Sequence, residues 1–95
     1  MPATITAISH YLPSDIIDNT YFEKYLDTSD EWILARTGIK ERRFLKEGAT
    51  SDLIVQAAQK LFNDYNINPE EIDTIIVATV TPDHMFPNTA AVVQN

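Results

Sequence analysis

Residues 51–80, SDLIVQAAQKLFNDYNINPEEIDTIIVATV, hold the two strongest secondary-structure patterns of the sequence. Apolar residues recur at alternating steps of one and three positions from Leu53 to Tyr65, which predicts a helix over residues 51–66 with a broad apolar stripe. The stretch TIIVATV, residues 74–80, is a β-branched run typical of a strand buried on both faces. A long helix followed by such a strand predicts an α/β fold.

Weaker signals divide the rest of the chain. Pro13 ends a β-branched opening run, and Gly38 marks the end of a helix that Thr28 or Ser29 can cap. The expected elements are a strand over 3–11, a short helix capped by Asn19, a helix over 30–37, an edge strand over 39–45 and a helix beginning near Pro87, while Thr50 or Ser51 would cap the long helix.

Composition excludes several classes of function. The 95 residues carry 7 Lys and Arg against 14 Asp and Glu, a net charge of -7 that argues against nucleic acid as a partner. The sequence has no cysteine, so as it stands it is not a thiol enzyme. It has neither a signal-peptide pattern nor the roughly 20 consecutive apolar residues that a bilayer span needs. We therefore expect a cytoplasmic protein that binds neither nucleic acid nor membranes.

Three residues near the expected helix over 30–37 form a candidate nucleotide-binding set. Thr28, Trp32 and Arg36 are spaced four apart, which at about 100° per residue places them within an arc of about 80° on one helix face. An indole offers a flat face to a purine, and a guanidinium can stack on the base or reach a phosphate. The spacing fits equally a Trp32 packed in the core beside Ile33 and an Arg36 that interacts with the negative end of the helix.

The loop over residues 81–87 follows the expected buried strand, where ligands of open α/β sheets gather. Adjacent side chains such as Asp83 and His84 rarely form an oriented acid–base pair, so a solvated His84 is expected. Phe86 can line an apolar pocket, contact a partner subunit or simply anchor the loop. Two distant histidines predict no metal site, and two glycines, Gly38 and Gly48, cannot form a phosphate-binding loop.

The motifs resemble those at the start of β-ketoacyl-[acyl-carrier-protein] synthase III, a thiolase-like condensing enzyme. The resemblance rests on Tyr11-Leu12-Pro13, on DTSDEWI at 27–33 running into RTGIKER at 36–42, and on IVAT at 76–79 followed by HMFP at 84–87. It covers the chain in order. It implies that residues 1–95 are the amino-terminal part of one thiolase-like α/β domain, with a mixed sheet flanked by helices and no internal boundary.

The resemblance also implies an activity. Such enzymes move an acyl group, usually acetyl, from coenzyme A onto a cysteine, and condense it with malonyl-acyl carrier protein to begin fatty acid synthesis. Acyl-CoA is thus a substrate, and no cofactor is implied. The positions matching Trp32 and Arg36 sandwich the adenine, and the one matching Thr28 contributes a hydrogen bond there. The position matching Phe86 reaches across a homodimer interface to shape the acyl pocket.

The family's catalytic Cys-His-Asn set has no counterpart in residues 1–95. We therefore expect this chain to contain no catalytic residue and to be inactive alone. The alternatives are a non-catalytic truncated fragment or interaction module, and part of another thiolase-like enzyme such as a hydroxymethylglutaryl-CoA synthase or a secondary-metabolite synthase.

Overall fold

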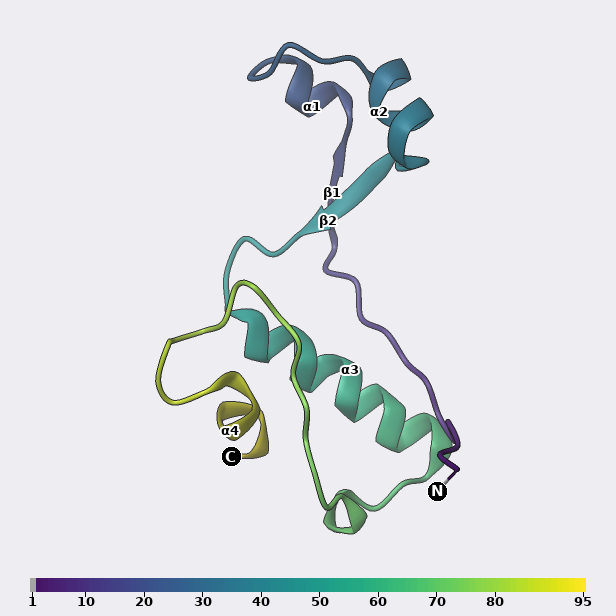
Figure 1. The fold of residues 1–95 in the computed structure, drawn as a ribbon, viewed down its shortest axis with the longest axis vertical. Helices are drawn as coiled ribbons and strands as arrows, with labels where there is room; N and C mark the ends of the chain where they lie inside the picture. The colour runs from purple at the N-terminus through teal and green to yellow at the C-terminus, as the bar shows by residue number, and fades with distance from the viewer. Residues whose placement is uncertain (1) are drawn as a thin grey trace. The chain divides into compact units, whose positions relative to one another are not determined.

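The computed structural model describes residues 2–95, which form two compact units (Figure 1). Residues 13–47 make up the first, which we call the hairpin unit. Residues 2–12 and 48–95 make up the second, which we call the helix unit.

The hairpin unit is built on two short antiparallel strands. In β1 (Asp15–Asp18) and β2 (Glu41–Phe44), Asp15 lies opposite Phe44 and Asp18 opposite Glu41. The edge strand expected over residues 39–45 is confirmed. Its partner β1 was not expected, because the two aspartates in its four residues hide the strand pattern in what reads as a polar loop.

Two helices, α1 (Thr20–Glu23) and α2 (Asp30–Thr37), connect these strands. The bounds predicted for α2 are confirmed. The Ser29 hydroxyl caps the helix by accepting a hydrogen bond from the Trp32 N–H at 3.1 Å, and Gly38 ends it in the left-handed conformation with φ 73°.

The cap expected for α1 is wrong. Asn19 has helical backbone angles and makes no cap hydrogen bond. The Asp18 carboxylate takes that role, since its Oδ1 accepts from the Tyr21 N–H at 3.3 Å and from the Thr20 hydroxyl at 2.5 Å. Because Asn19 does not cap α1, its side chain is available for contacts inside the hairpin unit.

The apolar part of the hairpin unit is a small aromatic cluster. Its neighbouring ring centroids lie 5.2–6.4 Å apart, and most of the pairs meet edge to face. The members are Tyr21, Phe22, Tyr25 and Phe44. The cluster joins α1 and the segment just after it to β2.

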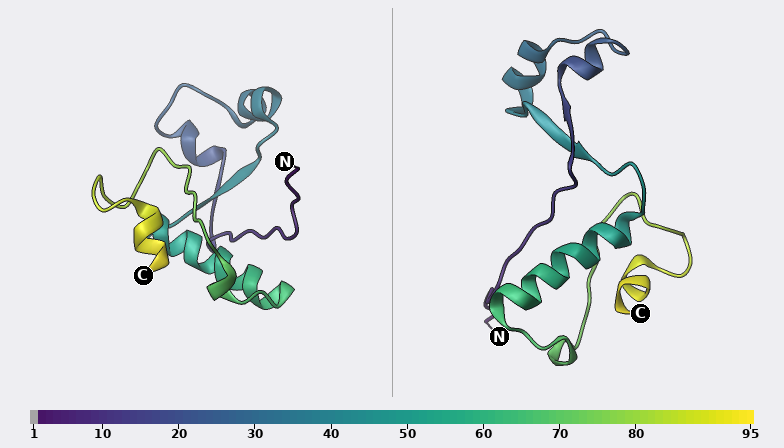
Figure 2. Two further views of the ribbon diagram at one scale, coloured as in Figure 1. Left: turned by 60° about the horizontal axis from the view of Figure 1, so that its bottom comes forward. Right: turned by 180° about the vertical axis from the view of Figure 1, so that it is seen from behind.

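The helix unit contains α3 (Thr50–Tyr65), the short 3-10 helix η1 (Pro69–Glu71) and α4 (Thr89–Gln94). The helix predicted over residues 51–66 is confirmed to within one residue at each end, and so is a helix following Pro87. The two further views in Figure 2 show α4 beside α3, against which it packs. Within residues 2–95, no helix is long and apolar enough to cross a membrane.

Two predicted strands are absent from residues 2–95. Residues 3–11 and 74–80 have no regular secondary structure, and no backbone hydrogen bond joins them. A strand exists only where a neighbouring strand pairs with it, and a run such as TIIVATV also needs covering on both faces. Instead, Ile76 is 88% and Val80 97% exposed. The sheet described is accordingly smaller than the mixed sheet expected from the sequence.

Burial follows an unusual pattern. Among residues 2–95 no apolar side chain is fully buried, and the three buried residues, Asn19, Ser51 and Thr89, are all polar. Buried polar groups are costly unless they are hydrogen-bonded. Each of the three does make hydrogen bonds, so these residues mark the points at which polar contacts organise each unit.

Candidate functional site

Trp32 and Arg36 lie together on one face of α2. The Arg36 guanidinium carbon is 5.3 Å from the centroid of the Trp32 ring, a cation–π contact. Trp32 is 56% exposed, so the structure does not place it in a core beside Ile33. The shared face predicted for these two residues is confirmed.

Thr28 does not share that face, and the arc predicted for all three residues is wrong. Thr28 precedes the cap residue Ser29, whose extended backbone (φ -140°, ψ 158°) breaks the helical rotation on which the prediction rested. The Thr28 hydroxyl is shielded from solvent and has no hydrogen-bond partner among residues 2–95. Before it could bind a ligand, this hydroxyl would have to become accessible.

The pair on α2 has the chemistry of a stacking site for a flat base. Stacked groups pack at about 3.5 Å, so a base held between indole and guanidinium needs them about 7 Å apart. The observed 5.3 Å is too short for that, and Arg36 must swing outward to admit a base. An exposed arginine at the end of a helix can do so by changing rotamers. The Trp32–Arg36 contact is thus a closed form of the candidate site.

Sequence reasoning missed the residue that lies at the centre of the hairpin unit. Asn19 is fully buried, with its Nδ2 donating to Asp30 Oδ1 at 2.8 Å and to the Ile39 carbonyl at 2.7 Å. Its Oδ1 accepts from Arg42 Nη2 at 3.0 Å. No local pattern reveals this role, because all of these partners lie at least 11 residues away along the chain.

The loop that carries Phe86 is tied to the start of α3. Asp83 Oδ1 accepts from the Ser51 N–H at 2.8 Å, and Asp83 Oδ2 accepts from the Ser51 hydroxyl. The predicted cap, the side chain of Thr50 or Ser51, is therefore wrong, since Asp83 binds the first turn of α3 from a distant loop. The Thr50 hydroxyl donates instead to the Thr81 carbonyl at 2.5 Å.

The Ser51 contacts also affect the acidity of Asp83. The Ser51 hydroxyl, and after it the Ser51 N–H, hold the pKa of Asp83 below its ordinary value of 3.8, because hydrogen bonds to a carboxylate favour its charged form. His84 is exposed, as predicted. The structure thus pairs Asp83 with a serine of α3 instead of with its histidine neighbour.

Phe86 is 91% exposed and its neighbour Met85 98% exposed. These two apolar side chains follow the Asp83 tether directly, and α4 begins three residues after Phe86. The Asp83 N–H also donates to the Thr89 hydroxyl at 3.4 Å, a contact that joins the two ends of the loop. The loop therefore presents Phe86 outward from a tethered base.

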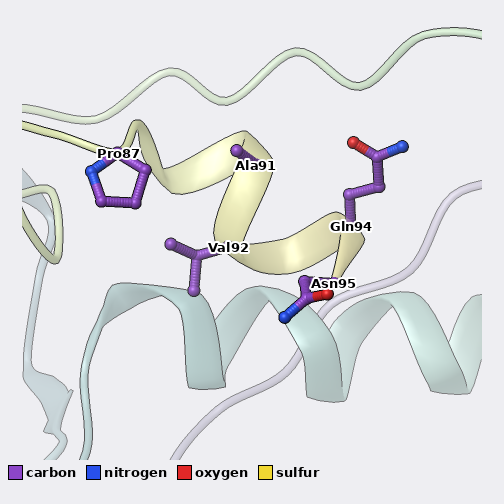
Figure 3. Close-up of a pocket in the computed structure, with 5 residues that line it drawn as sticks. All are labelled: Pro87, Ala91, Val92, Gln94 and Asn95. Carbon is purple, nitrogen blue, oxygen red and sulfur yellow. The ribbon is translucent and has the colours of Figure 1, made fainter.

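A depression beside α4 lies apart from the candidate site residues, and the described residues form no metal cluster. A depression of about 560 Å³ is lined by Pro87, Ala91, Val92, Gln94 and Asn95 (Figure 3). It contains no ionisable side chain and none of the candidate site residues. Within residues 2–95, no three His, Cys, Asp or Glu side chains are grouped as a metal site would need.

Comparisons with known proteins agree on one family name. The chain is 51% identical over 92 residues to β-ketoacyl-[acyl-carrier-protein] synthase III of Lactococcus lactis, and 54% identical over 94 residues to the Clostridioides difficile protein of that name. These matches cover 97% and 98% of this chain but only 28% and 29% of the relatives. No protein-family model matches the sequence.

Solved structures give the same result. The chain superimposes on β-ketoacyl-[acyl-carrier-protein] synthase III of Thermus thermophilus with a TM-score of 0.84 and 49% identity, covering 97% of this chain and 29% of that one. The Aquifex aeolicus enzyme gives 0.80 and 47%, with coverage of 93% and 30%. The thiolase-like α/β fold class is thereby confirmed. This chain corresponds, over nearly all of its own length, to the amino-terminal portion of β-ketoacyl-[acyl-carrier-protein] synthase III, as the resemblance in its motifs predicted.

Proposed function

We propose that this chain supplies the adenine-binding part of the coenzyme A site in a 3-oxoacyl-[acyl-carrier-protein] synthase III. The whole enzyme would condense an acyl-CoA, usually acetyl-CoA, with malonyl-acyl carrier protein to begin fatty acid synthesis. The observation that carries the proposal is the exposed Trp32 ring with Arg36 at 5.3 Å on α2, within a sequence about half identical to enzymes of that name.

In this proposal each group has a distinct role. Trp32 stacks on one face of the adenine, and Arg36 swings away from the indole to cover the other. Thr28 contributes a hydrogen bond at the same end of the nucleotide once its hydroxyl becomes accessible. The acyl transfer needs a cysteine thiolate, and the sequence contains no cysteine, so residues 1–95 alone would bind the nucleotide without condensing anything.

Phe86 has a separate proposed role at the interface of a cytoplasmic homodimer. Its side chain would reach across to the partner subunit and line the acyl pocket there. The 91% exposure of Phe86 and the tether at Asp83 support this role, because an apolar side chain held outward on an anchored loop is suited to insertion into another surface.

The proposal is tested by Trp32→Ala in the full-length polypeptide that carries residues 1–95. Losing one base–aromatic stack costs about 1–3 kcal/mol, so the KM for acetyl-CoA should rise roughly 5- to 150-fold. The kcat and the KM for malonyl-acyl carrier protein should change little, since those steps do not involve the adenine.

Tyr65→Ala is the matched control. Tyr65 is also a half-exposed aromatic residue on a helix, at 48%, but it belongs to α3. It should leave the KM for acetyl-CoA unchanged. An unaltered dependence on acetyl-CoA concentration in Trp32→Ala would refute the assignment of the adenine site to α2.

A further inference from the structure

The helix that carries Trp32 and Arg36 is fixed mainly by polar contacts at its two ends. No residue of α2 is buried, so packing gives this helix little orientation of its own. Its first residue, Asp30, receives a hydrogen bond from Asn19, and its backbone N–H donates to Glu23 Oε1 at 2.9 Å. Beyond its last residue, the chain turns back at Gly38 and presents the Ile39 carbonyl.

Both ends of α2 meet at one amide. Asn19 Nδ2 donates to Asp30 Oδ1 at 2.8 Å and to the Ile39 carbonyl at 2.7 Å, so a single nitrogen joins the start of the helix to the residue after its cap. An amide nitrogen has two hydrogens, and both are used. The same side chain is therefore a fixed point for the whole helix.

Asn19 is in turn held from the strand side. Its Oδ1 accepts from Arg42 Nη2 at 3.0 Å, and the Arg42 guanidinium carbon lies 4.5 Å from the centroid of the Phe22 ring. Arg42 thus has one contact to the amide and one to the aromatic cluster. Because Asn19 is 0% exposed, water cannot substitute for these partners.

We propose that Asn19 is the positioning residue of the nucleotide-binding face, holding α2 so that Trp32 and Arg36 meet the adenine of an acyl-CoA. This inference rests on the proposed function. Asn19 touches neither the ligand nor the reacting atoms, and it acts through the orientation of α2. Its removal should therefore weaken nucleotide binding without slowing the chemistry at saturation.

The test uses the full-length polypeptide, with free coenzyme A as the calorimetric probe and acetyl-CoA as the substrate. Asn19→Ala should raise both the Kd of coenzyme A and the KM for acetyl-CoA by roughly tenfold, because small misplacements of binding groups are costly. The kcat at saturation should stay within about twofold of the parent value. Asn63→Ala, which changes an exposed asparagine on α3, is the matched control and should change none of these values.

A double variant separates positioning from general loss of structure. If Asn19 acts through the face of Trp32 and Arg36, the loss of coenzyme A affinity in Asn19→Ala combined with Trp32→Ala should be clearly smaller than the sum of the two single losses. Additive losses in the double variant would overturn the proposal. So would a fall in kcat with an unchanged Kd for coenzyme A.

A milder variant keeps the test decisive if Asn19→Ala fails to fold. Asp30→Ala removes only one of the three contacts of Asn19, at a partly exposed position, and should raise the Kd in the same direction by a smaller factor. An unchanged Kd in Asp30→Ala would then overturn the proposal. If Trp32→Ala weakens binding while the variants of Asn19 and Asp30 do not, the positioning role fails and the proposed function stands. If Trp32→Ala has no effect, the proposed function itself fails.

Discussion

The hairpin unit and the helix unit are each organised around a polar anchor, and the two anchors differ in chemistry. The Asn19 anchor comprises Asn19 with Asp30, Ile39 and Arg42, and the Asp83 anchor comprises Asp83 with Ser51 and Thr89. An amide both donates and accepts, so Asn19 can join a carboxylate, a carbonyl and a guanidinium at once. The ionised side chain of Asp83 only accepts, and it binds a single residue, Ser51.

This difference separates what each anchor can control. The Asn19 side chain does not titrate, and it connects three elements around the candidate adenine site. The Asp83 side chain titrates, and it connects one loop, that of Phe86, to one helix end. We therefore expect the Asn19 anchor to set the geometry of a binding face, and the Asp83 anchor to act as a local and acid-sensitive tether.

The largest effect on the tether should come from deleting its carboxylate. In Asp83→Ala, the Ser51 N–H and hydroxyl both lose their acceptor, and Ser51 is only 7% exposed. Because an unsatisfied buried donor is costly, hydrogen exchange of the Ser51 amide should accelerate roughly tenfold or more. Exchange measured by NMR on the full-length polypeptide checks this.

Two controls confine that effect to the helix unit. Asp73→Ala removes an exposed aspartate from the same unit and should leave Ser51 exchange unchanged. The amides of α2 should also exchange at their parent rates in Asp83→Ala. Faster exchange in α2 would mean that the two anchors are not independent.

A smaller effect should follow from acid. The pKa of Asp83 is held below its ordinary value of 3.8, so its ionised form is favoured when the chain is folded. The stabilisation is therefore fully present above about pH 3.8, and is lost as the pH falls through the folded-state pKa. Protonation leaves one oxygen able to accept from the Ser51 N–H, so acid should loosen the tether less than Asp83→Ala does.

The measurement is the pH dependence of Ser51 amide exchange, corrected for the intrinsic rate. Exchange at Ser51 should accelerate as the pH falls, and we call this acceleration the acid limb. In Asp83→Asn the acid limb should disappear, because the amide keeps an acceptor for the Ser51 N–H but does not titrate. Asp18 has a pKa lowered by its hydrogen bond from Thr20, and its acid limb should appear in α1 and persist in Asp83→Asn. Persistence of the limb at Ser51 in Asp83→Asn would assign it to another group.

The features that the sequence could predict are those with local causes. The bounds of α2 follow from a serine cap and a terminal glycine, and those of α3 follow from an apolar stripe. The strands predicted over residues 3–11 and 74–80 are absent, because strand pairing depends on a partner elsewhere in the chain. TIIVATV has the composition of a buried strand, but Val80 lies 97% exposed.

The candidate site shows the same contrast between features with local causes and features that depend on distant residues. Trp32 and Arg36 could be placed on one face because both lie within α2, where rotation per residue is fixed. Thr28 could not, because the extended Ser29 interrupts that rotation. Both anchors escaped prediction. Asn19 looks like a helix cap, nothing near Asp83 in the sequence indicates Ser51 as its partner, and the residues that the Asn19 and Asp83 side chains contact lie 11 to 32 residues away.

The smallest effect should come from the ends of the two main helices, where the units again differ. Gly38 ends α2 with φ 73°, and Asn66 ends α3 with φ 54°. Nothing lies within 4 Å of a Cβ added to Gly38, so Gly38→Ala suffers only from the left-handed backbone, a cost of about 1 kcal/mol in the free energy of unfolding. Asparagine already tolerates the left-handed backbone, so Asn66→Gly should change the free energy of unfolding by less than about 0.5 kcal/mol. Chemical denaturation of both variants measures the difference. Gly38 adjoins the Ile39 carbonyl that Asn19 binds. A loss of unfolding free energy well above about 1 kcal/mol in Gly38→Ala would therefore show that the turn and the Asn19 anchor are energetically coupled.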